Sequence, residues 1–297
     1  MLRTLNEYSF LLRIPLALYR VFQPTLIQLM TEYIPFFKYH GAGNDFIMID
    51  DRHGIWDRKM TGAWIANACH RRFGIGADGL ILLQKGTDGA DFFMKYYNSD
   101  GRTSTFCGNG GRCIVAFAAA LQVHMGNCRF LGTDGWHEGE VLEDGMVRIS
   151  MTDVHQILLT GEDALILNTG SPHYVTFRDQ VSDLDVFTEG RAIRNSPSFQ
   201  KEGINVNFVE HNGPGEISVR TYERGVEDET FACGTGVVAS AIASAYASGN
   251  NDLSSWTVHA KGGDLRVDFL RSGKQDFTKV HLTGPAVEVF RGEIPGP

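Results

Sequence analysis

Two kinds of hydrophobic pattern alternate along the chain. Short runs rich in β-branched and aromatic residues predict strands, and longer apolar stretches predict helices. In the first part the predicted strands are 36–39, 46–49, 80–83, 92–97, 128–131 and 146–151, and the helices 61–73 and 109–123. In the second part the strands are 165–168, 204–209, 217–222, 256–259, 265–269, 280–282 and 287–290, and the helices 186–193 and 235–247.

The second part repeats the order of the first. Many strands, few helices and frequent hairpin turns favour an α+β fold class, with helices packed inside or on curved, mostly antiparallel sheets. No low-complexity tract or flexible linker separates the two halves, so the sequence places their boundary only near residues 152–161.

One short motif occurs once in each half. Cys107-Gly108-Asn109-Gly110 and Cys233-Gly234-Thr235-Gly236 share the pattern C-G-x-G. Each copy follows a polar turn after a predicted strand and opens an apolar helix. A single C-G-x-G is a weak signal, whereas two copies in matching contexts predict a pair of related sites.

Each motif places a thiol at the start of a helix. The unpaired N–H groups and the helix dipole there favour negative charge, so we expect the thiol pKa values to be lowered. The same N–H groups can bind a carboxylate, and the glycines allow close backbone approach. If the halves face each other, one small anion is held between two thiols.

Such a site suits the inversion of a stereocentre next to a carboxylate. One thiolate removes a proton from one face of the carbon and a thiol supplies one to the other face. The helix N–H groups would stabilise the charge that develops on the carboxylate.

The other cysteines and the composition narrow the function further. Cys69, Cys113 and Cys128 are expected to be buried small hydrophobes. Neither motif has metal-ligand or C-x-x-C spacing, so we predict no metal site and no dithiol redox motif. The 297 residues carry 27 basic against 35 acidic side chains, a net charge of −8, which argues against nucleic-acid binding. Five cysteines without a short secreted framework indicate free thiols in a reducing compartment.

Residues 1–29 differ in character from the rest. They contain three arginines and one glutamate, and prolines interrupt their apolar runs, so a membrane span is not expected. One interpretation is an extension upstream of a true start at Met30, which favours the cytoplasm. The other is an organelle transit segment, which would allow a plastid.

Six motifs together resemble the diaminopimelate epimerase family: residues 41–46 (GAGNDF), 97–101 (YNSDG), 107–113 (CGNGGRC), 203–208 (GINVNF), 222–225 (YERG) and 232–236 (ACGTG). The resemblance spans residues 36–290. It implies interconversion of LL- and meso-2,6-diaminopimelate without a cofactor, for lysine and peptidoglycan synthesis, by a homodimer. It also implies two pseudo-symmetric domains, each a barrel-like sheet around a central helix, at 30–152 plus 286–297 and at 153–285.

The resemblance also assigns roles to residues by motif. Cys107 and Cys233 would be the acid and base, with His173 and Glu223 beside the reacting centre, contacting the substrate ammonium and tuning the thiols. The carboxylate next to the reacting carbon would be held at the helix starts, and the distal end by amide and guanidinium groups. These carboxylate-binding residues are Gly108, Asn109, Gly234 and Thr235, and the distal residues are Asn44, Asn98, Asn205 and Arg224.

Two positions depart from the family pattern. Ser171 stands before Pro172-His173 where the family usually has asparagine, so it can still hydrogen-bond substrate but with one contact fewer. Gly79 stands where some members have a substrate-contacting glutamine. Both departures bear on the distal end, and so on which substrate is bound.

Two other functions remain open from the sequence. One is a two-cysteine racemase of another amino acid, although proline-type members typically have histidine where this chain has Asn109. The other is a non-catalytic relative that binds an amino acid or carboxylate, against which the presence of both cysteines argues.

Overall fold

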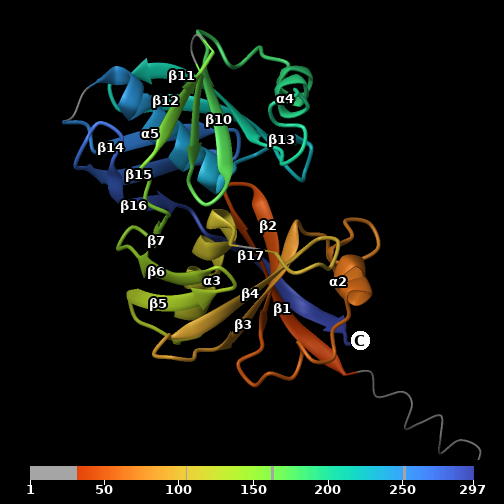
Figure 1. Ribbon diagram of the computed structural model, residues 1–297. Coiled ribbons are helices and arrows are strands. Elements are labelled where there is room, and N and C mark those ends of the chain that lie inside the picture. Colours follow the sequence, from red (N-terminus) through yellow and green to blue (C-terminus); the bar gives the residue numbers. More distant parts are fainter. Residues whose placement is uncertain (1–31, 105, 162–163, 250–251) are drawn as a thin grey trace, which may run out of the picture.

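The computed structural model describes residues 32–104, 106–161, 164–249 and 252–297. Residues 1–29, with both interpretations of that segment, lie outside the described residues. Within them the chain forms two lobes, the first half below the second in Figure 1.

Within the residues that the structure describes, the first half contains seven strands and two helices. The strands are β1 (Tyr33–Gly41), β2 (Asn44–Asp50), β3 (Gly79–Lys85), β4 (Phe92–Asn98), β5 (Asn127–Gly132), β6 (Gly135–Val141) and β7 (Val147–Ser150), and the helices are α2 (Gly62–Cys69) and α3 (Gly108–Ala120).

The second half follows the same plan. Its strands are β8 (Ile157–Thr160), β9 (Ala164–Asn168), β10 (Pro172–Phe177), β11 (Asn205–Gly213), β12 (Glu216–Glu223), β13 (Asp228–Thr230), β14 (Ser255–Ala260), β15 (Gly263–Arg271), β16 (Phe277–Gly284) and β17 (Val287–Pro295). Its helices are α4 (Val186–Arg194) and α5 (Gly234–Ser248).

Strand pairing repeats between the halves. In the first half β2 is parallel to β3, β3 is antiparallel to β4, and β4 is parallel to β5. In the second half β10 is parallel to β11, β11 antiparallel to β12, and β12 parallel to β14. The antiparallel pair β7–β16 joins the two sets, and the last strand, β17, returns to pair with β1. The structure therefore confirms an α+β fold with a duplicated plan.

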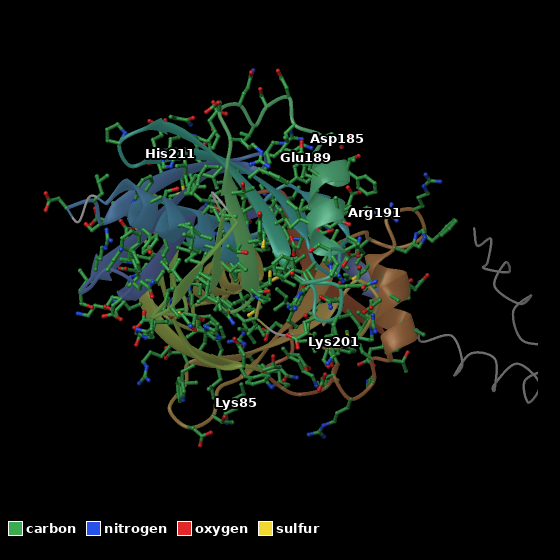
Figure 2. The ribbon with its side chains drawn as sticks, turned by 45° about the horizontal axis from the view of Figure 1, so that its top comes forward. Lys85, Asp185, Glu189, Arg191, Lys201 and His211 are labelled. Carbon is green, nitrogen blue, oxygen red and sulfur yellow. The ribbon has the colours of Figure 1, made fainter. Side chains whose placement is uncertain are left out.

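Each half wraps its curved sheet around one apolar helix. Residues of α3 and α5 belong to one large buried cluster together with the inner faces of both sheets. The shorter helices α2 and α4 cover outer faces and have smaller clusters of their own. Asp185 caps α4 by accepting from the Thr188 N–H, and Figure 2 shows it with Glu189 and Arg191 at the outside of the molecule.

All strands and helices predicted from the pattern are present, with shifted bounds. The largest error among the helices is in α2, which ends at Cys69 rather than at residue 73, and the largest among the strands is in β17, which continues to Pro295 rather than ending at residue 290. The chain turns back over the end of this helix, where the N–H groups of Ile75 and Gly76 both donate to the Ala68 carbonyl. A Cβ on Gly74 would lie 2.0 Å from the Asn67 carbonyl oxygen, so only glycine fits this turn. Four strands, β6, β8, β10 and β13, were not predicted.

Candidate active site

Cys107 and Cys233 stand immediately before the two central helices. Each is the N-cap residue, with an extended backbone, and neither makes a side-chain cap hydrogen bond. The glycine that follows each cysteine is the first helical residue. The first N–H groups of both helices are therefore near the cysteine sulfurs and are not bound by a capping side-chain oxygen, as an anion site requires.

The starts of the two helices meet. A Cβ on Gly234 would lie 3.2 Å from the Gly108 Cα and 3.3 Å from Leu282 Cδ2, so the backbones approach as closely as glycine permits. The Asn109 side-chain amide also crosses between the halves and donates to the Ala232 carbonyl at 2.7 Å. The duplicated motif thus forms one shared site rather than two separate ones.

The pKa values of both thiols are raised, which makes the expectation of lowered values wrong. Burial raises the pKa of Cys107 to about 11, and it raises that of Cys233 further. The charge of Glu223 acts in the same direction on both thiols. Backbone N–H groups at the helix starts oppose these effects but are outweighed. With pKa values raised in this way, both cysteines are neutral thiols at pH 7.

Cys233 is linked to a buried histidine through Thr235. The Cys233 sulfur lies 3.5 Å from the Thr235 hydroxyl, which lies 2.9 Å from His173 Nε2. Burial lowers the pKa of His173 to about 3, so the ring is neutral. Both ring nitrogens are engaged, Nδ1 by the Asn207 amide at 3.1 Å. His173 is therefore connected to Cys233 through Thr235, and its contact with a substrate ammonium stays a prediction.

Cys107 faces a different partner. Its sulfur lies 3.5 Å from Asn44 Oδ1 and can donate to it. The amide of Asn44 is oriented by Asp78, whose carboxylate accepts from Asn44 Nδ2 at 2.6 Å. Asp78 is itself paired with Arg71 at 2.6 Å. The amide oxygen of Asn44 is therefore turned toward the thiol.

Three of the predicted distal residues form one hydrogen-bonded group. Asn205 donates to the Ser171 hydroxyl at 2.9 Å and accepts from the Arg224 N–H at 2.9 Å. The Arg224 guanidinium donates to the same hydroxyl at 3.3 Å. Asn205 is buried, whereas Arg224 is exposed, and its guanidinium also donates to the Glu202 carbonyl at 3.1 Å.

Asn98 stands apart from this group. It ends β4 opposite Gly79, and within the described part of the chain its side chain makes none of the hydrogen bonds that link the other predicted residues. Gly79 is required by its neighbours, because a Cβ there would lie 2.5 Å from both the Tyr96 ring and the Tyr97 carbonyl. The Tyr96 ring therefore fills the space beside this position.

Sequence reasoning missed three polar residues of the site. Asp78 orients Asn44, Asn207 contacts His173, and the fully buried Arg112 donates to Asn109 Oδ1 at 2.9 Å. Asn207 had a recognisable signal, since Asn205 and Asn207 alternate within an apolar strand and so face the same side.

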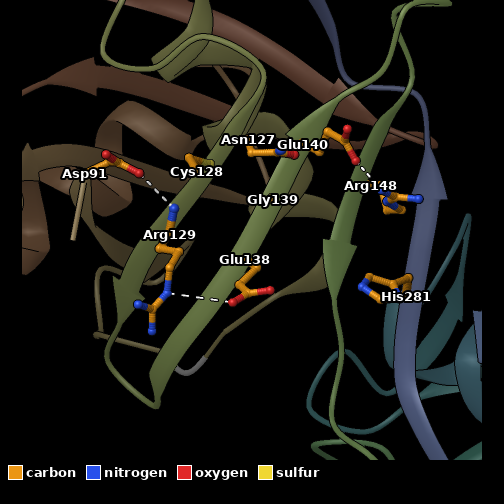
Figure 3. A pocket seen from close by; sticks show the side chains of 9 residues that line it. All are labelled: Asp91, Asn127, Cys128, Arg129, Glu138, Gly139, Glu140, Arg148 and His281. Atoms are coloured by element: carbon orange, nitrogen blue, oxygen red, sulfur yellow. Dashed lines mark hydrogen bonds and ion pairs between the residues drawn. The ribbon is translucent and has the colours of Figure 1, made fainter. Parts of the chain in front are cut away.

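A separate surface pocket lies on the outer face of β5, β6, β7 and β16 (Figure 3). Its charged groups pair with one another, as Arg148 does with Glu140 and Arg129 with Glu138. It includes none of the predicted site residues.

Within the ranges described above, no group of three or more His, Cys, Asp or Glu side chains is arranged to hold a metal ion. None of the helices described there has the length and apolar character needed to cross a membrane.

Solved structures share this architecture at low sequence identity. A phenazine biosynthesis protein of the PhzF family from Bacillus anthracis superposes with a TM-score of 0.70 at 15% identity, covering 89% of this chain and 99% of its own. A hydroxyproline epimerase from Agrobacterium vitis gives 0.62 at 14% identity, covering 88% and 91%. The chain thus has the two-lobed fold of these proteins.

Sequence relatives define the family within that fold. The family model for diaminopimelate epimerase matches residues 36–157 and 165–289. Diaminopimelate epimerase from Flavobacterium psychrophilum is 47% identical over 258 residues, covering 87% of this chain and 99% of the relative. The enzyme of the same name from Chlorobaculum tepidum is 42% identical, covering 86% and 98%. This chain belongs to the diaminopimelate epimerase family.

Proposed function

We propose that the protein interconverts LL- and meso-2,6-diaminopimelate without a cofactor, with Cys107 and Cys233 as the acid–base pair. The observation that carries this proposal is the meeting of two helix starts, each with a cysteine at its cap. Membership of the family supplies the substrate. We further propose that the enzyme serves lysine and peptidoglycan synthesis as a cytoplasmic homodimer.

In the proposed reaction the substrate carboxylate lies at the helix starts. The N–H groups after Gly108 and Gly234 bind it and stabilise the charge that develops as the α-proton leaves. One cysteine, as thiolate, takes that proton and becomes a thiol, while the other, as thiol, gives a proton to the opposite face and becomes a thiolate. The reverse reaction exchanges these roles.

Glu223 couples substrate binding to thiol ionisation in this scheme. Its negative charge raises the pKa of both thiols. A substrate ammonium placed beside Glu223 would cancel that charge and so favour formation of one thiolate. The base would then form only when substrate is bound.

The distal amino-acid end would be recognised by the hydrogen-bonded group around Asn205 and by the two remaining amides. Arg224 can grip a carboxylate with two parallel hydrogen bonds. Ser171 shares its hydroxyl with Asn205 and Arg224, and so positions the guanidinium as well as offering a contact. Asn44 and Asn98 would complete this end of the site.

Proton NMR of LL-diaminopimelate with reduced protein in D2O tests the proposal. Loss of the α-proton signal together with appearance of the meso isomer is expected. Cys107→Ser and Cys233→Ser should each abolish the reaction or leave a trace, because a serine hydroxyl is far less acidic than a thiol. Cys128→Ala changes a buried thiol outside the site and should leave the reaction intact.

Other outcomes separate the two alternative functions. Exchange with other amino acids but not with diaminopimelate would keep the two-thiol mechanism and refute the substrate. If no amino acid exchanged in protein shown to have free thiols, a binding role would replace catalysis.

A further inference from the structure

A chain of polar side chains is buried behind Cys233. Thr221 donates to Asn207 Oδ1 at 3.0 Å, Asn207 contacts His173 at 3.1 Å, and His173 contacts Thr235 at 2.9 Å. The side chains of His173 and Asn207 are fully buried. Burying such groups is costly unless they are hydrogen-bonded, and here both are.

The Tyr174 carbonyl fixes the direction of this chain. Asn207 Nδ2 donates to it at 3.2 Å, and a backbone carbonyl can only accept. The same NH2 group therefore faces His173 Nδ1, which must accept. In a neutral imidazole the proton then resides on Nε2, which donates to the Thr235 hydroxyl.

The direction of these hydrogen bonds determines what Thr235 offers to the Cys233 sulfur. A hydroxyl has one proton, and Thr235 Oγ1 already accepts from His173. Its own proton is then available to the Cys233 sulfur at 3.5 Å. A hydrogen bond donated to sulfur favours the thiolate. In the other half, the Asn44 amide oxygen accepts from Cys107 and so favours the thiol.

The first half shows that the fold itself does not need this polar chain. The two halves can be aligned by strand register, and also by the contacts of the glycine two residues after each helix start. Both alignments place His173 at the position of Phe46 and Asn207 at the position of Ile81. A Cβ on Gly236 would meet Asn207 and His173, and one on Gly110 would meet Ile81 and Phe46. Apolar side chains pack at these positions in one half and hydrogen-bonded polar ones in the other.

We propose that Asn207 is a positioning residue for the Cys233 site, holding His173 as the tautomer protonated on Nε2 so that Thr235 donates to the Cys233 sulfur. The effect on turnover rests on the proposed function, whereas the tautomer does not. Asn207 touches no reacting atom and acts through His173 and Thr235.

Nitrogen-15 NMR of histidine-labelled protein tests the tautomer directly. The His173 signals are assigned by their loss in His173→Gln. Protonation on Nε2 is expected in the unaltered protein, and protonation on Nδ1 would overturn the proposal. This measurement needs no substrate, so it stands whether or not diaminopimelate is the substrate.

Asn207→Ile gives the second readout by copying the residue of the first half. Without the amide donor, Nδ1 is free to be protonated, so the Nε2-protonated population should fall. The kcat should fall about tenfold or more, the effect of losing a hydrogen bond to a charged group, with KM little changed. Ile81→Val at the matching position of the first half should leave the tautomer and kcat unaltered.

The variant can also refute the proposal. An Asn207→Ile protein that keeps Nε2 protonation overturns it, whatever its kcat, since any loss would then have another cause. A changed tautomer with unchanged kcat for diaminopimelate, in protein that is active on it, would overturn the link to Cys233. If the variant does not fold, the tautomer of the unaltered protein decides.

Discussion

Alkylation of Cys107 tests whether burial or the helix start controls the thiols. Its pKa is raised from an ordinary value of 9.0 to about 11. Two units correspond to about 3 kcal/mol in favour of the thiol. A helix start contributes only about 0.3–2 kcal/mol in the opposite sense. Because the raised pKa favours the neutral form, reactivity should grow with pH until pH passes the pKa.

The expected rate follows from the thiolate fraction. At pH 8 about one Cys107 in a thousand is thiolate, against about one in ten for an ordinary cysteine, so alkylation should be roughly 100-fold slower. Iodoacetamide labelling from about pH 7 to about pH 10, with peptide mass spectrometry, measures this at each cysteine. Burial raises the pKa of Cys69, Cys113 and Cys128 to about 12, so Cys107 should be labelled first.

Arg112 provides a second perturbation of known direction. Its buried guanidinium lowers the pKa of Cys107 and donates to the Gly108 carbonyl at 3.3 Å. Arg112→Met should therefore slow labelling further, and Arg112→Lys, which keeps the charge, should slow it less. Rapid labelling of Cys107 with an inflection below pH 9 would refute the reasoning. Faster labelling in Arg112→Met would refute the sign of the charge effect.

Two pairs of glycine variants test the packing around the site. Gly234→Ala should reduce stability by about 1–3 kcal/mol and lower kcat, because its Cβ would press on the facing helix start. Gly108→Ala should reduce stability and kcat less, because the nearest contact of its Cβ would be an ordinary 3.4 Å. Equal effects of the two substitutions on urea unfolding and on turnover would contradict this prediction. Gly79→Ala should destabilise by at least as much, since its Cβ would lie 2.5 Å from a ring and a carbonyl. Gly213→Ala has open space and should leave the unfolding midpoint near that of the unaltered protein.

The repeated order of strands and helices could be predicted because it depends on local sequence patterns. Apolar runs located the paired strands, and the repeated C-G-x-G located both central helices to within a residue at their starts. Of the missed strands, β6 and β13 lack an apolar run, and β8 is a run of only four residues. β6 contains three polar side chains and two glycines among its seven residues, and β10 begins with Pro172, a position in a strand that proline tolerates.

The electrostatics of the site could not be predicted from local pattern. The helix start beside Cys107 was visible in the sequence, but the burial that outweighs it arises when residues from both halves pack around the sulfur. Glu223 lies more than a hundred residues away in the chain and still acts on it. The roles of Asp78 and Asn207 likewise depend on strand register, which places them against Asn44 and His173.

The backbone of the site is duplicated between the halves, whereas the side chains behind the two thiols differ, and each feature serves a different chemical requirement. The proposed inversion needs an acid–base group on each face of one carbon, and the two matching helix starts would supply both with the same geometry. The thiols need not ionise equally, however, because the residues behind them differ. Arg112 on α3 has Val238 at the matching position of α5, and both are fully buried. A charged guanidinium thus acts on Cys107, while a neutral polar chain ending at Thr235 acts on Cys233. We therefore expect substitutions behind one thiol to change its pKa without an equal change at the other.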